Sequence, residues 1–403
     1  MTGNRVGPVA SGSANRFRDL TAVRDGDGYV IGSPRSPDYL AVPEIGGQVV
    51  EWLRAGHELE RCAELAEAAA GQTVDVVRFV AVLDDAGLLP DETEARDDSA
   101  AAPVRCRRIG RFLFGPTGLV IQLVLGLAAI VLLVSAPDLR PTFEDGFIVD
   151  TPMAAMLALA AIGTAGGVLH EVAHVLAAAR FGVRSRLSIS RRLFVIVYQT
   201  DLTGLWGLPR RQRAVPIAAG MTSDAAILGL LLIAELMLPA DPHPLVPAVV
   251  RALVLLKITA LVFQIEVFMR TDVYALFALA TRSRNLWAVK GAVARAVLRR
   301  ATDDDRRLLA TTSPREVKWA RLYLLLYLPG VAWATWYLVE FGIPSIVRIT
   351  ELSAGAISMD GLLSVGGLSG AAALALCFGP LVWTMWGVGR SAGRTARQLL
   401  RPS

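Results

Sequence analysis

Two histidines and a glutamate near the middle of the chain have the types and spacing of a hydrolytic metal site. They lie in the stretch His-Glu-Val-Ala-His at residues 170–174. On a helix, His170 and His174 share one face, one turn apart, where both can bind a single zinc ion. Glu171 is then placed to take a proton from a metal-bound water. Residues 151–169 before the motif contain no charged side chain, so this chemistry is predicted at membrane depth.

A third ligand is expected from a carboxylate elsewhere, because a catalytic zinc ion takes three protein ligands and keeps one position open for water. Asp272 follows the fourth apolar run and is predicted to reach the same depth as the two histidines. Glu266 is the competing candidate, and Asp272 could instead be a helix-start or snorkelling residue near the membrane surface. We therefore expect Asp272 to complete the ligand set, with Glu171 as the catalytic base.

Asp224 is a further acid within an apolar run, and it should face a polar cavity rather than lipid. It could orient the metal site, contact the backbone of a substrate, or pair with a neighbouring arginine. The remaining histidines are weaker candidates, since His57 has no second histidine nearby and His243 lies between prolines in a short loop. A His-Glu-His cluster in a membrane helix is costly, and such clusters normally mark functional sites.

The composition places this chemistry in a polytopic membrane protein. The 403 residues have a mean hydropathy of +0.47 and are 53% hydrophobic, unlike an ordinary soluble enzyme. Six apolar runs have about the length of a membrane-spanning helix. They are residues 113–136, 151–169, 214–234, 252–269, 322–339 and 361–389. We predict a mainly α fold of about six transmembrane helices, preceded by a small winged-helix-like α+β domain.

Positive charge predicts the orientation of these helices. Arginines gather at residues 105–111, 180–213, 282–307 and 390–401, whereas the alternate loops hold few of them. The positive-inside rule then places both termini in the cytoplasm. The basic residues are almost all arginine, which suggests a GC-rich bacterial genome and hence a bacterial cell membrane. Because the arginines flank membrane segments instead of forming one stripe, the net charge of +5 does not indicate nucleic-acid binding.

The polar segment before the first apolar run has the pattern of a small folded domain. Residues 29–31 and 39–42 are predicted to form short strands joined by a turn. Residues 44–53 and 59–70 each carry apolar side chains on one helical face. A third helix is predicted to begin around residues 73–75, which supply its N-cap region.

Residues 187–198 alternate in part between apolar and polar side chains, which predicts a strand or hairpin just after the metal-binding helix. An exposed edge there could hold an extended substrate by strand addition. A surface hairpin with no role in substrate binding is an equally good interpretation.

These observations divide the chain into seven regions. In order they are a disordered N-terminus (1–20), a small folded domain (21–90), a linker (91–111), a catalytic transmembrane core with the metal site (112–280), a basic cytoplasmic loop (281–316), two C-terminal transmembrane helices (317–389) and a basic cytoplasmic tail (390–403). Residues 90–103 are acidic and rich in alanine, as expected of a flexible connection to the first span.

The His-Glu-x-x-His helix, a glycine-bearing third span and a later aspartate at the end of another span together resemble the site-2 protease family of intramembrane zinc metalloproteases. The resemblance covers roughly residues 153–274. It implies that His170, His174 and Asp272 bind zinc. It also implies that Glu171 is the general base of peptide-bond hydrolysis.

The chain departs from that family beside the third ligand. The family commonly has Asp-Gly there, whereas Asp272 is followed by Val273, and residues 264–269 replace the usual Asn-Pro. These departures leave the ligand chemistry intact and the handling of substrate open. In this respect the chain is more similar to the peptide zinc metalloproteases of ribosomal-peptide biosynthesis clusters, and among them to those of daptide-type clusters.

The N-terminal pattern of strands followed by three short helices resembles the PqqD-like winged-helix domain, which recognises leader peptides. A small helical domain with another binding role is the alternative. The resemblance implies zinc-dependent removal of the leader from a precursor peptide bound by this domain, with other enzymes of the same cluster as partners. Two other functions stay open. They are regulated intramembrane proteolysis of a regulator such as an anti-sigma factor, and a non-catalytic membrane immunity or transport role.

Overall fold

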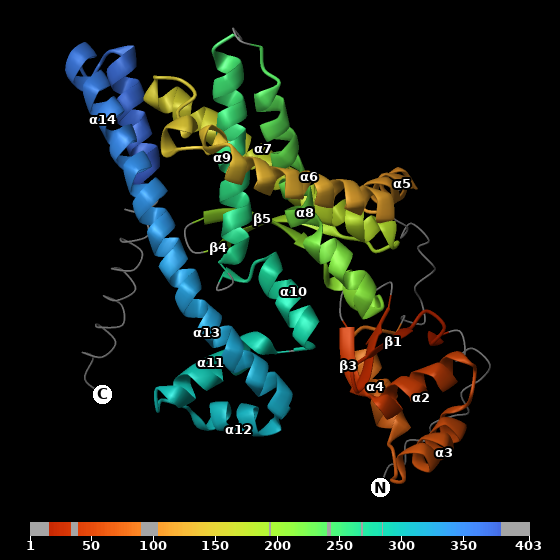
Figure 1. The fold of residues 1–403 in the computed structure, drawn as a ribbon. Helices are drawn as coiled ribbons and strands as arrows, with labels where there is room; N and C mark the ends of the chain where they lie inside the picture. The colour runs from red at the N-terminus through yellow and green to blue at the C-terminus, as the bar shows by residue number, and fades with distance from the viewer. Residues whose placement is uncertain are drawn as a thin grey trace, which may run out of the picture. The chain divides into compact units, whose positions relative to one another are not determined.

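The computed structural model describes residues 16–33, 39–89, 104–192, 195–239, 243–266, 269–283 and 285–379. These residues are mainly helical, with a three-stranded sheet near the N-terminus and a two-stranded hairpin near the middle of the chain (Figure 1). The chain divides into two compact units. One draws on Met1–Gly115, His174–Arg186 and Thr200–Ile217, and the other on Pro116–Ala173, Leu187–Gln199 and Ala218–Ser403.

The first unit begins with an antiparallel sheet in the order β1-β2-β3. Its strands are β1 (Thr21–Asp25), β2 (Gly28–Gly32) and β3 (Tyr39–Pro43). Val30 pairs with Val23 on one side and Ala41 on the other, which sets the register. Both predicted strands are confirmed. β1 was not predicted, because its five residues include two charges; most of the predicted turn after β2 lies outside the described residues.

Three helices follow the sheet and enclose an apolar core. They are α2 (Glu44–Arg54), α3 (Leu59–Ala70) and α4 (Val76–Asp85). All three were predicted, and α4 starts where the Asp75 side chain accepts a hydrogen bond from the Arg78 backbone. Leu53, Cys62 and Leu83 are fully buried in this core, and burial raises the pKa of the Cys62 thiol. Sheet and helices therefore share one hydrophobic core.

Five helices among the described residues are long and apolar enough to cross a membrane. They are α6 (Pro116–Ser135), α7 (Pro152–Arg180), α8 (Arg210–Leu236), α9 (Leu245–Ile265) and the helix Pro314–Met359. They match the first five predicted spans. The sixth predicted run begins with a shorter apolar helix, Val365–Gly379, and continues outside the described residues. By length and composition, the chain is compatible with a polytopic membrane protein.

The fifth of these helices is longer than predicted. Residues 342–360 were expected to form a loop, but α13 (Pro314–Tyr337) continues through a π-helical turn (Leu338–Gly342) into α14 (Ile343–Asp360). Pro344 lies in the first turn of α14, where a missing backbone N–H is tolerated. Pro344 therefore does not end the helix, contrary to the expectation of a loop.

The basic segment 281–316, predicted as a loop, is folded. After α10 (Asp272–Thr281) it forms α11 (Leu286–Val297) and α12 (Asp303–Thr311). Val289 is fully buried and belongs to the same apolar cluster as Tyr323 of α13. Hydrogen bonds from the Arg295 guanidinium and from Thr302 hold the pKa of Asp305 below its ordinary value. Because arginines occupy the outer faces of these helices, the sequence indicated a polar loop and not the apolar face.

Helices α6 and α8 approach each other closely at small residues. A Cβ atom added to Gly229 would lie 2.2 Å from the Leu125 carbonyl oxygen, and one added to Gly126 would lie 3.2 Å from the Ala225 Cβ. Helices in a membrane gain little from burying apolar surface, so close van der Waals contact through small residues is a usual way of packing. Gly229 is therefore a packing requirement of the helical core.

Replacing Gly229 with alanine is expected to lower the thermal unfolding temperature of the detergent-purified protein, because the added methyl group must displace the α6 backbone. The loss of stability should be on the order of 1–3 kcal/mol. Gly163→Ala in α7 is the matched control, since an added Cβ there meets nothing within 4 Å and gains the same helix propensity. Equal unfolding temperatures for the two variants would contradict this packing.

Candidate metal centre

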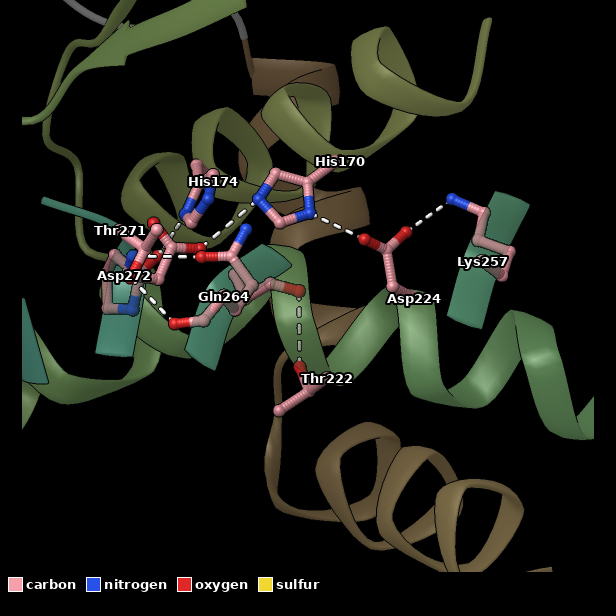
Figure 2. Close-up of polar contacts among 10 residues, drawn as sticks. His170, His174, Thr222, Asp224, Lys257, Gln264, Thr271 and Asp272 are labelled. Atoms are coloured by element: carbon pink, nitrogen blue, oxygen red, sulfur yellow. Dashed lines mark hydrogen bonds and ion pairs between the residues drawn. The ribbon is translucent and has the colours of Figure 1, made fainter. Parts of the chain in front are cut away.

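Helix α7 carries both histidines of the motif and runs through them without interruption. Because an α-helix has 3.6 residues per turn, side chains four positions apart lie on the same face. His170 and His174 are both buried, at 8% and 2% exposure. Figure 2 shows the two imidazoles near Asp272 and Gln264, with Asp224 and Lys257 on the other side of the His170 ring. The predicted pair thus lies inside the protein.

Asp272 is the first residue of α10, with Thr271 at the N-cap. Gln264, near the end of α9, accepts two hydrogen bonds from the start of α10. Its side-chain oxygen accepts the Asp272 backbone N–H at 3.0 Å, and its carbonyl oxygen accepts the Thr271 hydroxyl at 2.7 Å. Arg270 has a left-handed backbone with φ of +56°, and its guanidinium lies 4.2 Å from the centre of the Trp287 ring. These contacts fix where the Asp272 carboxylate lies.

The three predicted ligands come together. One ligand atom from each of His170, His174 and Asp272 lies within 4.8 Å of the other two, so the group could hold a metal ion. Two imidazoles and a carboxylate suit zinc and several other transition metals, so the donor set alone does not select zinc. Asp272 is a helix-start residue, as the alternative interpretation held, and it is also a member of this metal group.

Hydrogen bonds on the far side of each ring decide which nitrogen faces the metal position. His174 Nδ1 lies 2.7 Å from the Pro216 carbonyl oxygen, which can only accept, so Nδ1 carries the proton and Nε2 keeps its lone pair. His170 Nδ1 lies 2.7 Å from the Asp224 carboxylate, which assigns the same tautomer. His170 Nε2 and Asp272 Oδ2 are then two acceptors 3.2 Å apart. A proton or a metal cation must bridge them, so the residues fit a bound metal.

Asp224 orients His170, and the partner of its second oxygen is Lys257 in α9 rather than an arginine. Asp224 is 1% exposed and Lys257 5%, so this ion pair is buried among apolar helices. A buried charge without a partner is costly, and the lysine supplies the compensation. Lys257 was missed as a site residue. The available signal was that two opposite charges in separate apolar runs are expected to pair inside a membrane.

The other acidic and histidine candidates lie outside the metal group. Glu171 is half-buried beside His170 and does not belong to the metal group. Glu266 follows the last residue of α9 and does not join the metal group found among the described residues. His57 and His243 are exposed and lie outside this group as well.

A β-hairpin follows the metal helix, as predicted for residues 187–198. Its strands are β4 (Arg186–Arg192) and β5 (Val195–Asp201), and they form a two-stranded sheet. Tyr198 on β5 lies against α7, because a Cβ added to Gly167 would sit 3.4 Å from the Tyr198 ring. Gly167 is one turn before His170, so the hairpin contacts the metal helix close to the motif.

Comparison with known proteins does not identify the chain. No protein-family model matches it, and no match was found among curated proteins or among solved structures.

Replacing His174 with alanine is expected to abolish tight metal binding, because two donors remain where a stable catalytic site needs three. Metal content of the purified protein should fall from about one ion per chain to a small fraction of that. His243→Ala is the matched control, since it removes an exposed histidine outside the metal group. Undiminished metal content in the His174 variant would rule out this site.

Asp224→Asn is expected to weaken metal binding by about 10–100-fold, because it removes the charged acceptor that orients His170 and leaves Lys257 without its counter-charge. The measurement is a competition titration against a metal chelator. Asp145→Asn is the matched control. It breaks the part-buried ion pair with Arg251, which involves none of the metal ligands. Equal metal affinity in both variants would show that Asp224 has no role in orientation.

Proposed function

We propose that this protein is an intramembrane zinc endopeptidase that removes the leader from a ribosomally synthesised and modified peptide. The observation that carries the proposal is the meeting of two imidazoles and one carboxylate, from His170, His174 and Asp272, within 4.8 Å of one another. The histidines lie on a helix that is long and apolar enough to span a membrane. Two buried imidazoles and a part-buried carboxylate, with an acid beside them, are suited to hydrolysis.

The roles of the chain's own residues in this reaction follow from their contacts. When bound, zinc supplies a Lewis acid that polarises the scissile carbonyl and makes a coordinated water easier to deprotonate. His170 and His174 present neutral Nε2 donors, because Asp224 and the Pro216 carbonyl hold their Nδ1 protons. Glu171 accepts the proton of the water and passes it to the leaving amine.

The proposal assigns the catalytic part of the chain to the site-2 protease-like class. Its support is the pairing of the motif on α7 with an aspartate about a hundred residues later, beside the same two histidines. Val273 after Asp272 remains a departure from that class, and it points toward the peptide zinc metalloproteases of biosynthesis clusters. The order of three strands and then three helices in residues 21–85 supports a PqqD-like recognition domain.

The proposed location is a bacterial cell membrane, with both termini in the cytoplasm. The support is the excess of arginine in alternate connections, together with five described helices of spanning length and the shorter apolar helix Val365–Gly379, which would begin the sixth crossing. In this orientation the N-terminal domain and the metal centre share a compartment, so a precursor peptide could be bound and cleaved on one side. The β4–β5 hairpin offers a strand edge beside α7 for an extended peptide.

Glu171→Gln is the decisive variant, because it removes the base and leaves all three metal ligands in place. Purified protein in liposomes is incubated with candidate precursor peptides, meaning any short peptides encoded near its gene, and products are measured by mass spectrometry. We expect cleavage to fall by at least about 100-fold, since general base catalysis contributes that much or more, while the metal content stays at the wild-type level. A zinc chelator should stop the wild-type reaction.

Glu351→Gln, an exposed change on α14, is the matched control and should cleave like the wild type. Full cleavage by the Glu171 variant would exclude the proposed mechanism. Cleavage of an anti-sigma factor in place of the precursor would instead favour the signalling function. A wild-type protein that binds metal and cleaves neither would favour a non-catalytic role.

A further inference from the structure

The N-terminal sheet has a second face, and the chain covers it with its own later residues. Along β1, Ala22 packs against the domain core, so Thr21, Val23 and Asp25 point to the opposite face. The short helix η4 (Thr203–Gly207) lies on that face. Tyr39 donates its hydroxyl to the Gly204 carbonyl oxygen at 3.3 Å. The first unit is therefore held together by contacts between the N-terminal domain and the segment that leads into α8.

Gly207 shows how tightly this segment approaches the sheet. A Cβ added there would lie 3.4 Å from the Tyr39 hydroxyl oxygen and 3.9 Å from Thr21 Oγ1. Burial raises the pKa of the Tyr39 phenol, while the nearby Arg213 charge acts in the opposite direction. The contacts of Gly207 therefore place the end of η4, just before α8, against β1 and β3.

Arg213, in the first turn of α8, is the strongest link in this contact. It is 2% exposed, and its guanidinium donates to the carbonyl oxygens of Leu208 at 2.8 Å and Trp206 at 3.1 Å. Its remaining nitrogen pairs with the Asp25 carboxylate at 3.2 Å. A buried guanidinium needs a counter-charge, and here a residue 188 positions earlier supplies it. Docking of the sheet and burial of Arg213 therefore depend on each other.

The same turn of α8 also reaches the metal centre. Pro216 follows Arg213 by three residues, and its carbonyl oxygen accepts the Nδ1 proton of His174 at 2.7 Å. A proline inside a helix removes a backbone hydrogen bond and weakens the helix locally. The missing bond is the one from residue 216 to the residue 212 carbonyl, so the Pro216 turn is tied less firmly to the helix on its N-terminal side. Tertiary contacts such as those of Arg213 therefore help to hold this turn. Arg213 is the nearest buried anchor on its N-terminal side.

We propose that Arg213 is a positioning residue that fixes the Pro216 carbonyl against His174 when the N-terminal domain is docked through Asp25. The metal centre is then fully assembled only with the domain in place. A peptide held by the domain is accordingly presented to a site whose second histidine the same docking has oriented. This inference rests on the proposed function, because it concerns the regulation of that metal site.

The test uses the full-length protein loaded with cobalt(II), whose visible absorption reports ligand geometry, and measures hydrogen exchange at residues 203–208 in parallel. Asp25→Asn should speed exchange in this segment, alter the cobalt spectrum and weaken cobalt binding by about 10-fold, the lower range for loss of a group that orients a ligand. Asp25→Glu keeps the charge and should restore both readouts. Asp84→Asn, which breaks the Arg16 ion pair within the same domain, is the matched control and should change neither.

Protection of α2 from exchange shows that the domain stays folded in every variant compared. An Asp25→Asn protein with faster exchange at residues 203–208 but an unchanged cobalt spectrum and affinity would overturn the proposal. Unchanged exchange at residues 203–208 in the Asp25→Asn protein would also overturn the proposal. Failure of the wild-type protein to bind cobalt would be a different result. It would refute the metal site itself, and this inference with it.

Discussion

Burying ionic groups among apolar helices is the constraint on which this structure depends. Asp224 lies within one span-length helix and is almost fully buried, a position that is unfavourable unless its charge is matched. Lys257 from α9 pairs with one carboxylate oxygen, and the ring of His170 from α7 hydrogen-bonds to the other. These two contacts join α7, α8 and α9 at the level of Asp224. The chain of contacts ends at His170 Nε2, which faces Asp272.

Helix α8 orients both imidazoles, by two different means. The Asp224 carboxylate holds His170, while the Pro216 carbonyl oxygen, about two turns earlier on the same helix, holds His174. The first histidine along α7, His170, meets the later acceptor on α8, and His174 meets the earlier one. Each ring therefore has its own acceptor for Nδ1, and both rings turn Nε2 to the same side. Asp272 then arrives on a separate element, held by Gln264 through a side-chain oxygen and a carbonyl oxygen. The arrangement supports the proposed peptidase chemistry with few residues.

Several elements could be predicted because their signal is local. Five of the six apolar runs became span-length helices, and the two predicted strands and three helices of the N-terminal domain appeared within a few residues of their predicted limits. Local signals failed where a neighbour decided the outcome. Strand β1 carries two charges and exists because β2 pairs with it, and α11 has an apolar face that is recognisable only from its packing against α13. Residues 342–360 became helix because a π-helical turn precedes Pro344.

The sequence by itself determined the ligand chemistry, since the spacing of His170 and His174 on a helix places both on one face whatever surrounds them. It also indicated Asp272 as the third member of the metal group and Glu171 as the proposed base, which residue type and order along the chain can suggest. Only the tertiary structure decided how the rings are turned, because the partners of Nδ1 are a lysine-paired carboxylate and a backbone carbonyl on another helix. Likewise, no local pattern could pair Asp25 with Arg213, because these residues meet only when the chain folds back over nearly half its length.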